Sequence, residues 1–136
     1  MPLLYRDAPL NSIWEGSGNV AALDVLRALM REPEALPAFM AECKEASGAD
    51  ARLDKHIADI EADLAAFDPE EAQWRARALV ERLALAFQAS LLVRYAPPAV
   101  ADAFCGGRLG GGGGRAYGTL PAGVDAQAIL DRALAA

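Results

Sequence analysis

Apolar side chains recur at helical spacing along most of the chain, which predicts helices. The clearest stripe is made of Leu53, Ile57, Ile60, Leu64 and Phe67, which lie four and three residues apart. Asp50 precedes this stripe and suits the cap of its helix. An earlier stripe follows Asn19, also a suitable cap, and Pro33 should end that helix. No segment alternates with the two-residue period of a strand, so the pattern predicts an all-α fold.

The longest predicted helix covers residues 70–96. The tetrapeptide Asp68-Pro69-Glu70-Glu71 is a typical helix start, with aspartate as the cap and proline at the first helical position. Pro97-Pro98 should end the helix. Its apolar residues occupy more than one side, which indicates a central helix of a bundle or a helix buried at a subunit contact.

Shorter elements complete the prediction. A helix is expected over residues 34–46 with Gly48 just past its end, and a short one over residues 98–105. Asp125 should cap a last helix, whose Ile129, Leu130 and Leu134 are expected to face inward. Residues 1–18 are expected to form an extended lead and a turn. The chain is therefore predicted to be one domain, 1–136, built as an all-α bundle of about four longer helices and one or two short ones.

A glycine-rich segment covers residues 106–118 and contains five consecutive glycines, Gly110 to Gly114. Such a run can suggest a phosphate-binding loop. No predicted strand precedes it, however, and no Gly-Lys-Ser/Thr ends it. A flexible loop is the better interpretation.

The charge distribution argues against a general nucleic-acid binder. The net charge is −6, and residues 32–69 carry ten acidic against three basic side chains. Residues 70–136 carry seven arginines against six acids. Arg75, Arg82, Arg94, Arg108 and Arg115 could form a basic patch. The favoured interpretation pairs these arginines with Glu71, Glu81 or Asp102 on the surface.

Cysteine and histidine are too few for a disulfide framework or a metal site. Cys43 and Cys105 are expected to be small packing residues of a protein in the reducing cytoplasm. The single histidine, His56, lies beside an apolar stripe and is expected to be a boundary residue, not a base. No signal peptide is expected, and the longest apolar run, Leu83 to Val93, is too short to span a bilayer.

Candidate chemistry is concentrated in residues 6–19. Glu15 follows Trp14 and precedes Gly16-Ser17-Gly18, a backbone that can turn tightly and approach a ligand. A carboxylate beside an indole in a poorly solvated pocket would have a raised pKa, useful for proton abstraction. Amide groups of residues 17–21 could hold an anion at a helix start. The alternative interpretation is an ordinary turn followed by a helix cap.

Three segments resemble acyl-CoA dehydrogenases. The first is similar to the C-terminal signature of that family, and the other two are similar to its AidB-like subgroup of alkylation-response proteins, often labelled isovaleryl-CoA dehydrogenase-like. They are Arg6-Asp7-Ala8 with Ile13-Trp14-Glu15-Gly16-Ser17 and Asn19, then Phe104 to Leu109, then Tyr117 to Pro121. The resemblance implies the helical C-terminal domain of such a protein, without the other domains of the family.

The resemblance also implies functional roles. Glu15 matches the catalytic base, Ser17 and Asn19 match positions that contact FAD, and Trp14 and Gly16 would border the acyl-CoA substrate. The chain alone is expected to be inactive, because one carboxylate and a helix start cannot hold a dinucleotide. Two alternatives remain: a DNA-binding module of an alkylation-response protein, and a helical oligomerisation domain. Members of the family are oligomers, so we expect a homo-oligomer, a dimer or a tetramer.

Overall fold

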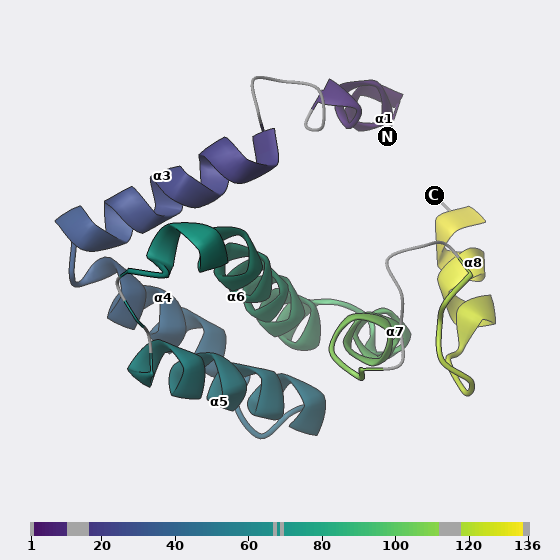
Figure 1. Cartoon of the computed structure of the whole chain (residues 1–136). Coiled ribbons are helices and arrows are strands. Elements are labelled where there is room, and N and C mark those ends of the chain that lie inside the picture. Colours follow the sequence, from purple (N-terminus) through teal and green to yellow (C-terminus); the bar gives the residue numbers. More distant parts are fainter. Residues whose placement is uncertain (1, 11–16, 67, 69, 112–117, 135–136) are drawn as a thin grey trace.

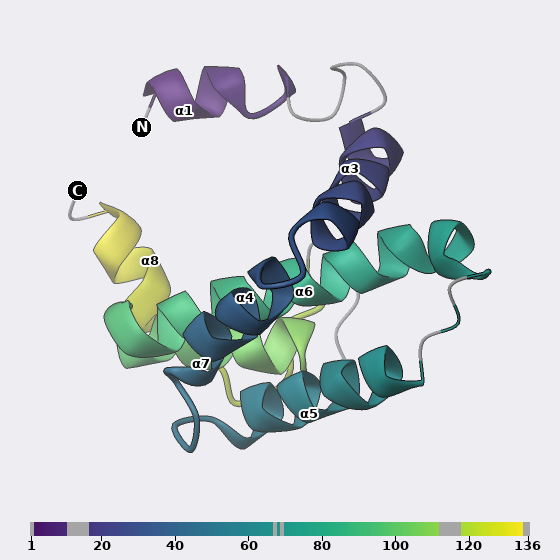
Figure 2. The same cartoon turned by 90° about the vertical axis from the view of Figure 1, so that its left-hand side faces the viewer.

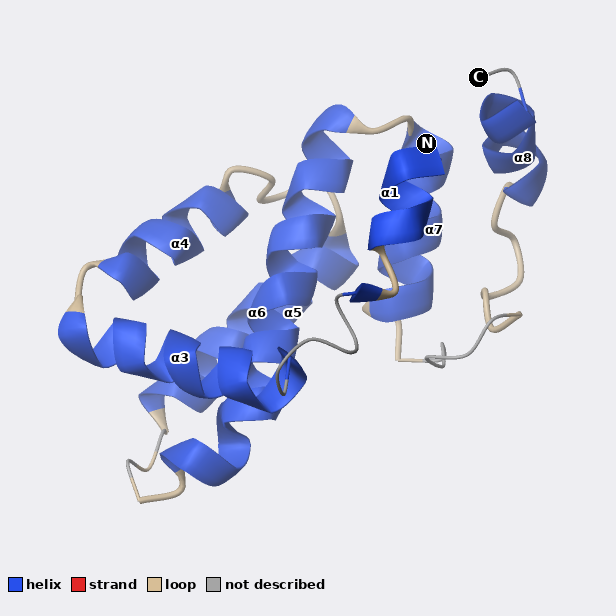
Figure 3. Ribbon diagram, turned by 90° about the horizontal axis from the view of Figure 1, so that it is seen from above, coloured by secondary structure: helices blue, strands red, loops and turns tan. Residues whose placement is uncertain are grey.

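The computed structural model describes residues 2–10, 17–66, 68, 70–111 and 118–134, and within them every regular element is a helix (Figures 1 and 3). The helices are α1 (Pro2–Asp7), α3 (Ser17–Arg31), α4 (Ala35–Lys44), α5 (Ala51–Ala65), α6 (Ala72–Tyr95), α7 (Pro98–Arg108) and α8 (Ala126–Leu134). The predicted all-α class is therefore confirmed. Within these ranges, no helix combines the length and the apolar character that crossing a membrane requires.

Helix α6 lies at the centre of the molecule, which was one of the two positions that its apolar pattern indicated. It packs against α3, α4, α5 and α7, and α8 is attached through α7 (Figure 2). The buried side of α6 consists of Ala76, Leu79, Leu83, Ala86, Ala89 and Ser90. Small residues at four of these six positions let neighbouring helices approach closely. The core is completed by Leu53 and Ile60 of α5, which have no exposed surface.

The start of α5 follows the predicted capping chemistry. Asp50 has extended backbone angles, φ −146° and ψ 117°, and its carboxylate accepts hydrogen bonds from the amides of Arg52 and Leu53. The Arg52 guanidinium lies 2.6 Å from Asp50 Oδ2 and 2.8 Å from Asp102 Oδ1 on α7. The cap of α5 thus also connects α5 to α7.

Three predictions about where helices begin are wrong. Residues 2–7 form α1 instead of an extended lead, and α3 begins at Ser17, so Asn19 lies in its first turn instead of capping it. Helix α6 begins at Ala72, because the Asp68 carboxylate accepts from the Glu70 amide, 2.9 Å away, and closes a separate turn. Short polar side chains stabilise turns as readily as helix starts, so the pattern alone did not distinguish the two.

Two ends also differ from the prediction. Gly48 has the left-handed φ of +81°, but it lies three residues beyond the C-cap Glu45 of α4 and belongs to the following turn. Helix α7 continues through Gly106 and Gly107, so the predicted loop over 106–118 is wrong for its first residues. The confirmed ends are Arg31 before Pro33 and Tyr95 before Pro97.

The last helix, α8, is capped by Asp125 as predicted, since its Oδ1 accepts from the Ala128 amide at 3.0 Å. Ile129 is half-buried. Leu130 and Leu134 are 55% and 84% exposed, so the prediction that they face inward is wrong. The physical reason is that α7 is the main neighbour of α8 among the described helices, and no residue of α8 is fully buried (Figure 1).

Candidate functional site

The candidate site predicted from sequence surrounds the start of α3. Trp14, Glu15 and Gly16 lie outside the described residues. Ser17 is the first residue of α3, and Asn19 is exposed in the first turn. The first amides of a helix have no intrahelical partner, so α3 presents hydrogen-bond donors and the positive end of its dipole immediately after Glu15 in the sequence.

Arg77 of α6 lies against this helix start, a contact that sequence analysis missed. A Cβ placed on Gly18 would be only 1.5 Å from Arg77 Nη1, so the guanidinium occupies the space that a side chain at position 18 would fill. Among the described residues, no carboxylate forms an ion pair with Arg77. The guanidinium and the helix dipole together make the start of α3 favourable for an anion.

No feature of the sequence separated Arg77 from the other arginines of its segment. Gly18 stood out only as part of a turn, and its contact with Arg77 depends on how α3 crosses α6. This crossing is the most extensive helix contact of the described structure. The packing of these two helices therefore places the positive charge of Arg77 at the site.

Most arginines proposed as a basic patch are paired, as the favoured interpretation predicted. Arg94 lies 2.6 Å from Glu42, Arg75 lies 3.8 Å from Glu71, and Arg82 pairs with Asp63. Glu42 and Asp63 were not among the predicted partners. Asp102, which was, pairs with Arg52 instead. A surface where positive charges are matched by carboxylates attracts the phosphate backbone only weakly.

The cysteines and the histidine occupy packing positions. Cys43 and Cys105 have no exposed surface, and burial raises the pKa of each thiol to about 11. His56 Nε2 lies 3.0 Å from the backbone oxygen of Arg82, where α5 meets α6, which fits the predicted boundary position. Within the ranges that the structure describes, no group of histidines, cysteines and carboxylates could hold a metal ion.

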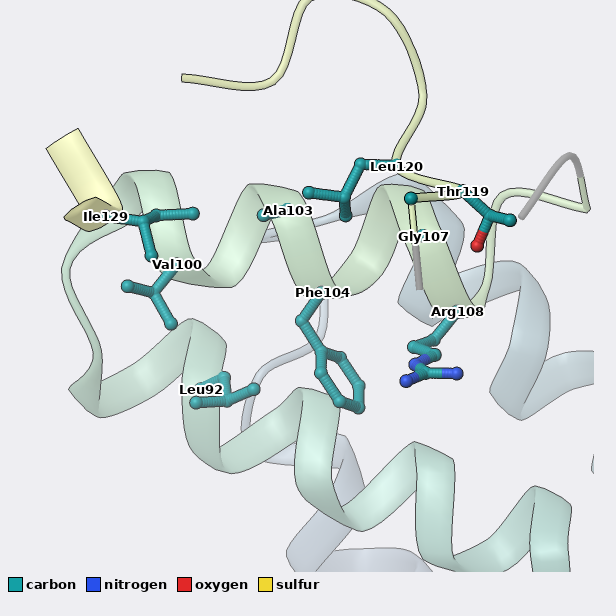
Figure 4. A pocket seen from close by; sticks show the side chains of 10 residues that line it. Leu92, Val100, Ala103, Phe104, Gly107, Arg108, Thr119, Leu120 and Ile129 are labelled. Atoms are coloured by element: carbon teal, nitrogen blue, oxygen red, sulfur yellow. The ribbon is translucent and has the colours of Figure 1, made fainter. Parts of the chain in front are cut away.

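The two C-terminal sequence motifs come together in space. Phe104, Gly107 and Arg108 of the first motif and Gly118, Thr119 and Leu120 of the second line one pocket of about 390 Å³ (Figure 4). The glycines allow this contact. A Cβ on Gly107 would lie 3.2 Å from Leu120 Cδ2, and one on Gly106 would lie 3.1 Å from the ring of Pro121. A side chain at Gly106 would meet the rigid ring of Pro121, whereas one at Gly107 would meet only the flexible end of Leu120.

Comparison with known proteins gives one informative match. No family model matches the chain. No solved structure matches it. The protein named "Putative acyl-CoA dehydrogenase AidB" of Escherichia coli (strain K12) is 33% identical over 105 residues, which are 77% of this chain and 19% of that protein. The chain thus spans about a fifth of the length of this relative. Through this match, the chain belongs to the acyl-CoA dehydrogenase family, as the motifs of the sequence indicated.

Proposed function

We propose that this chain is the C-terminal helical domain of an FAD-dependent acyl-CoA dehydrogenase-like protein. In this proposal it supplies a catalytic glutamate and one edge of the flavin site, and it is inactive alone. One observation carries the proposal: the sequence motif with Glu15 leads directly into α3, whose first turn is in contact with the guanidinium of Arg77, which has no carboxylate partner among the described residues. A carboxylate next to a positive helix start suits proton abstraction beside a bound anion.

The described residues fit part of a flavin dinucleotide. Its pyrophosphate is an anion, and free helix amides with an arginine are the groups that hold such anions in proteins. Arg77 and the amides at the start of α3 would contact the phosphates, while the side chains of Ser17 and Asn19 would donate hydrogen bonds. When bound, FAD accepts the hydride that leaves the β-carbon of an acyl-CoA.

In this reaction the residues before α3 would carry out the proton abstraction. Glu15 would remove the proton from the α-carbon of the thioester. Trp14 would exclude water and raise the pKa of Glu15, and Gly16 would let the backbone approach the substrate. The chain contributes these groups from one side only, so we expect neither tight flavin binding nor turnover without the rest of such a protein.

The first experiment measures FAD binding by equilibrium dialysis at low ionic strength, where weak phosphate contacts are strongest. We expect weak binding that Arg77→Gln reduces about tenfold, the loss expected for one charge-assisted hydrogen bond. Arg31→Gln is the matched control, because it removes the same charge from the opposite end of α3 and should leave binding unchanged. Equal effects of the two variants would reject the assignment of Arg77.

The second experiment tests activity. The chain is mixed with FAD and either butyryl-CoA or isovaleryl-CoA under anaerobic conditions, and the flavin absorbance is followed. We expect no bleaching. Bleaching that Glu15→Gln abolishes would show that the chain is active alone and would refute that part of the proposal, while supporting Glu15 as the base.

A role in assembly is a second candidate function. Leu3, Leu4 and Tyr5 on α1 are exposed, and so are Leu130 and Leu134 on α8. Exposed apolar side chains that cluster on a helix commonly mark a contact with another chain or domain. We propose a homo-oligomeric contact through these helices.

A further inference from the structure

The pocket lined by the two C-terminal motifs has the size of a small-molecule site. Its volume of about 390 Å³ lies within the range of roughly 300–1,000 Å³ that is typical of ligand pockets. Its walls come from α6, α7, α8 and the segment 118–120. The pocket does not include any residue of α3, so it is separate from the proposed flavin edge.

The lining is divided into an apolar end and a polar end. In Figure 4, Leu92, Val100 and Ile129 lie toward one end, and Arg108 and Thr119 lie toward the other, with Phe104 between them. The three aliphatic side chains are half-buried, so they remain within reach of a ligand. A pocket with this division matches a molecule with an alkyl chain and one polar group.

The positive charge at the polar end of the pocket indicates that the ligand is an anion. In the described part of the chain, no carboxylate pairs with Arg108, whereas Arg52, Arg82 and Arg94 each have at least one carboxylate partner. The planar guanidinium offers paired donors that match the geometry of a carboxylate. Because Gly107 has no Cβ, the second motif can lie against α7 and close one side of the pocket.

We propose that this pocket binds a medium-chain fatty-acid anion. The alkyl chain would lie against Leu92, Val100 and Ile129, and the carboxylate would accept hydrogen bonds from Arg108. The ligand is a free monocarboxylate, not an acyl-CoA, because one arginine can neutralise one carboxylate but not the several phosphates of the coenzyme.

Titration of the full chain with octanoate, followed by calorimetry or by NMR shifts, tests the proposal. Saturable one-to-one binding is expected. Arg108→Gln should weaken it at least tenfold, as for loss of a charge-assisted hydrogen bond. Ile129→Gln should weaken it several-fold by placing a polar group against the alkyl chain. Arg132→Gln removes the same charge from α8 outside the pocket and should change nothing.

Chemical controls separate the contribution of the ligand's carboxylate from that of its alkyl chain. 1-Octanol and octylamine should bind at least tenfold more weakly than octanoate, and propionate should not bind measurably. Circular dichroism and thermal unfolding of each variant confirm that it is folded. Ile129→Gln keeps the test valid if Arg108→Gln alters the fold.

Several results would overturn the proposal. Octanol binding as tightly as octanoate would make the site purely apolar. An unchanged affinity in Arg108→Gln, or no saturable binding of octanoate at all, would reject the assignment. The wild-type chain could instead self-associate without binding octanoate. If Ile129→Gln then abolished the self-association, a second copy of the chain would be the occupant of the pocket. None of these outcomes depends on FAD binding, so failure here is distinguishable from failure of the proposed function.

Discussion

Asp50 is the residue whose chemistry is best defined by the structure. Its carboxylate accepts from two backbone amides at the start of α5 and from the Arg52 guanidinium. The side-chain hydrogen bond from Arg52 is the main reason that the pKa of Asp50 is lowered from its ordinary value of 3.8. The ionised form is therefore bound more tightly in the folded chain than in the unfolded chain.

Asp50→Asn keeps the capping ability and removes the charge. We expect it to lower the free energy of unfolding at pH 7 by about 1–2 kcal/mol, the range for a charge-assisted cap. Because the folded-state pKa is the lower one, this contribution is complete above the unfolded pKa and is lost as the pH falls through the folded value. Urea unfolding at pH 7 and pH 3 should show the difference shrinking at pH 3. Asp59→Asn, at an exposed ion pair with Lys55, is the control and should have little effect.

The cysteines provide a second prediction at this scale. Burial raises the pKa of Cys43 and Cys105 to about 11, so almost no thiolate is present at pH 8. Iodoacetamide should react with the native chain far more slowly than with the chain in urea. Mass spectrometry of the alkylated protein measures both rates. Rapid modification of either cysteine under native conditions would contradict its burial.

At the scale of elements, α5 and α8 differ in whether their apolar stripes are buried. Leu53 is fully buried between α5 and the rest of the core, whereas Leu134 is 84% exposed although it belongs to an equally regular stripe. The difference arises because α5 packs on α4, α6 and α7, whereas α8 packs on α7. A stripe predicts the helix, and the neighbours decide whether its side chains are buried.

Leu53→Ala should therefore lower the free energy of unfolding by about 2–5 kcal/mol, through lost burial and an unfilled cavity. Leu134→Ala should change it by less than about 0.5 kcal/mol, as for other surface substitutions. Chemical denaturation of both variants under the same conditions makes the comparison. Similar losses in the two variants would show that α8 packs more closely than the structure indicates.

Helix α7 offers a second test at this scale. Gly106→Ala would place a methyl group 3.1 Å from the Pro121 ring and 3.2 Å from Arg52, whereas Gly107→Ala would meet only the end of Leu120. Alanine stabilises a helix by up to about 1 kcal/mol relative to glycine. Leu120 can rotate away, so Gly107→Ala should be neutral or stabilising in thermal unfolding. Gly106→Ala should be clearly less stable than Gly107→Ala, because the rigid proline ring cannot yield as easily.

At the scale of the whole molecule, the exposed apolar side chains of α1 point to assembly. Leu3, Leu4 and Tyr5 are 66%, 68% and 82% exposed. Sedimentation at tens of micromolar should show at least a dimer. Leu3→Ser with Leu4→Ser should shift the chain toward monomer, whereas Leu120→Ser, which removes an exposed leucine far along the chain, should not. A wild-type chain that is strictly monomeric would reject the contact.

The family assignment rested on local sequence, and the match to the AidB protein supports it over 105 residues. The roles of Glu15, Ser17 and Asn19 stay predictions, since Trp14, Glu15 and Gly16 lie outside the described residues. Arg77 could not have been predicted, because its position beside Gly18 depends on two helices separated by about half of the domain.

Local sequence was enough to predict the helices after α1 and several of their ends, since helical spacing, prolines and capping aspartates act over a few residues. Asp50 and Asp125 capped the helices that their positions predicted. The burial of each apolar stripe, the pairing of the arginines and the pocket between the two C-terminal motifs all depended on tertiary packing. These properties depend on contacts between distant segments, and a local pattern holds no information about which partner a surface will meet.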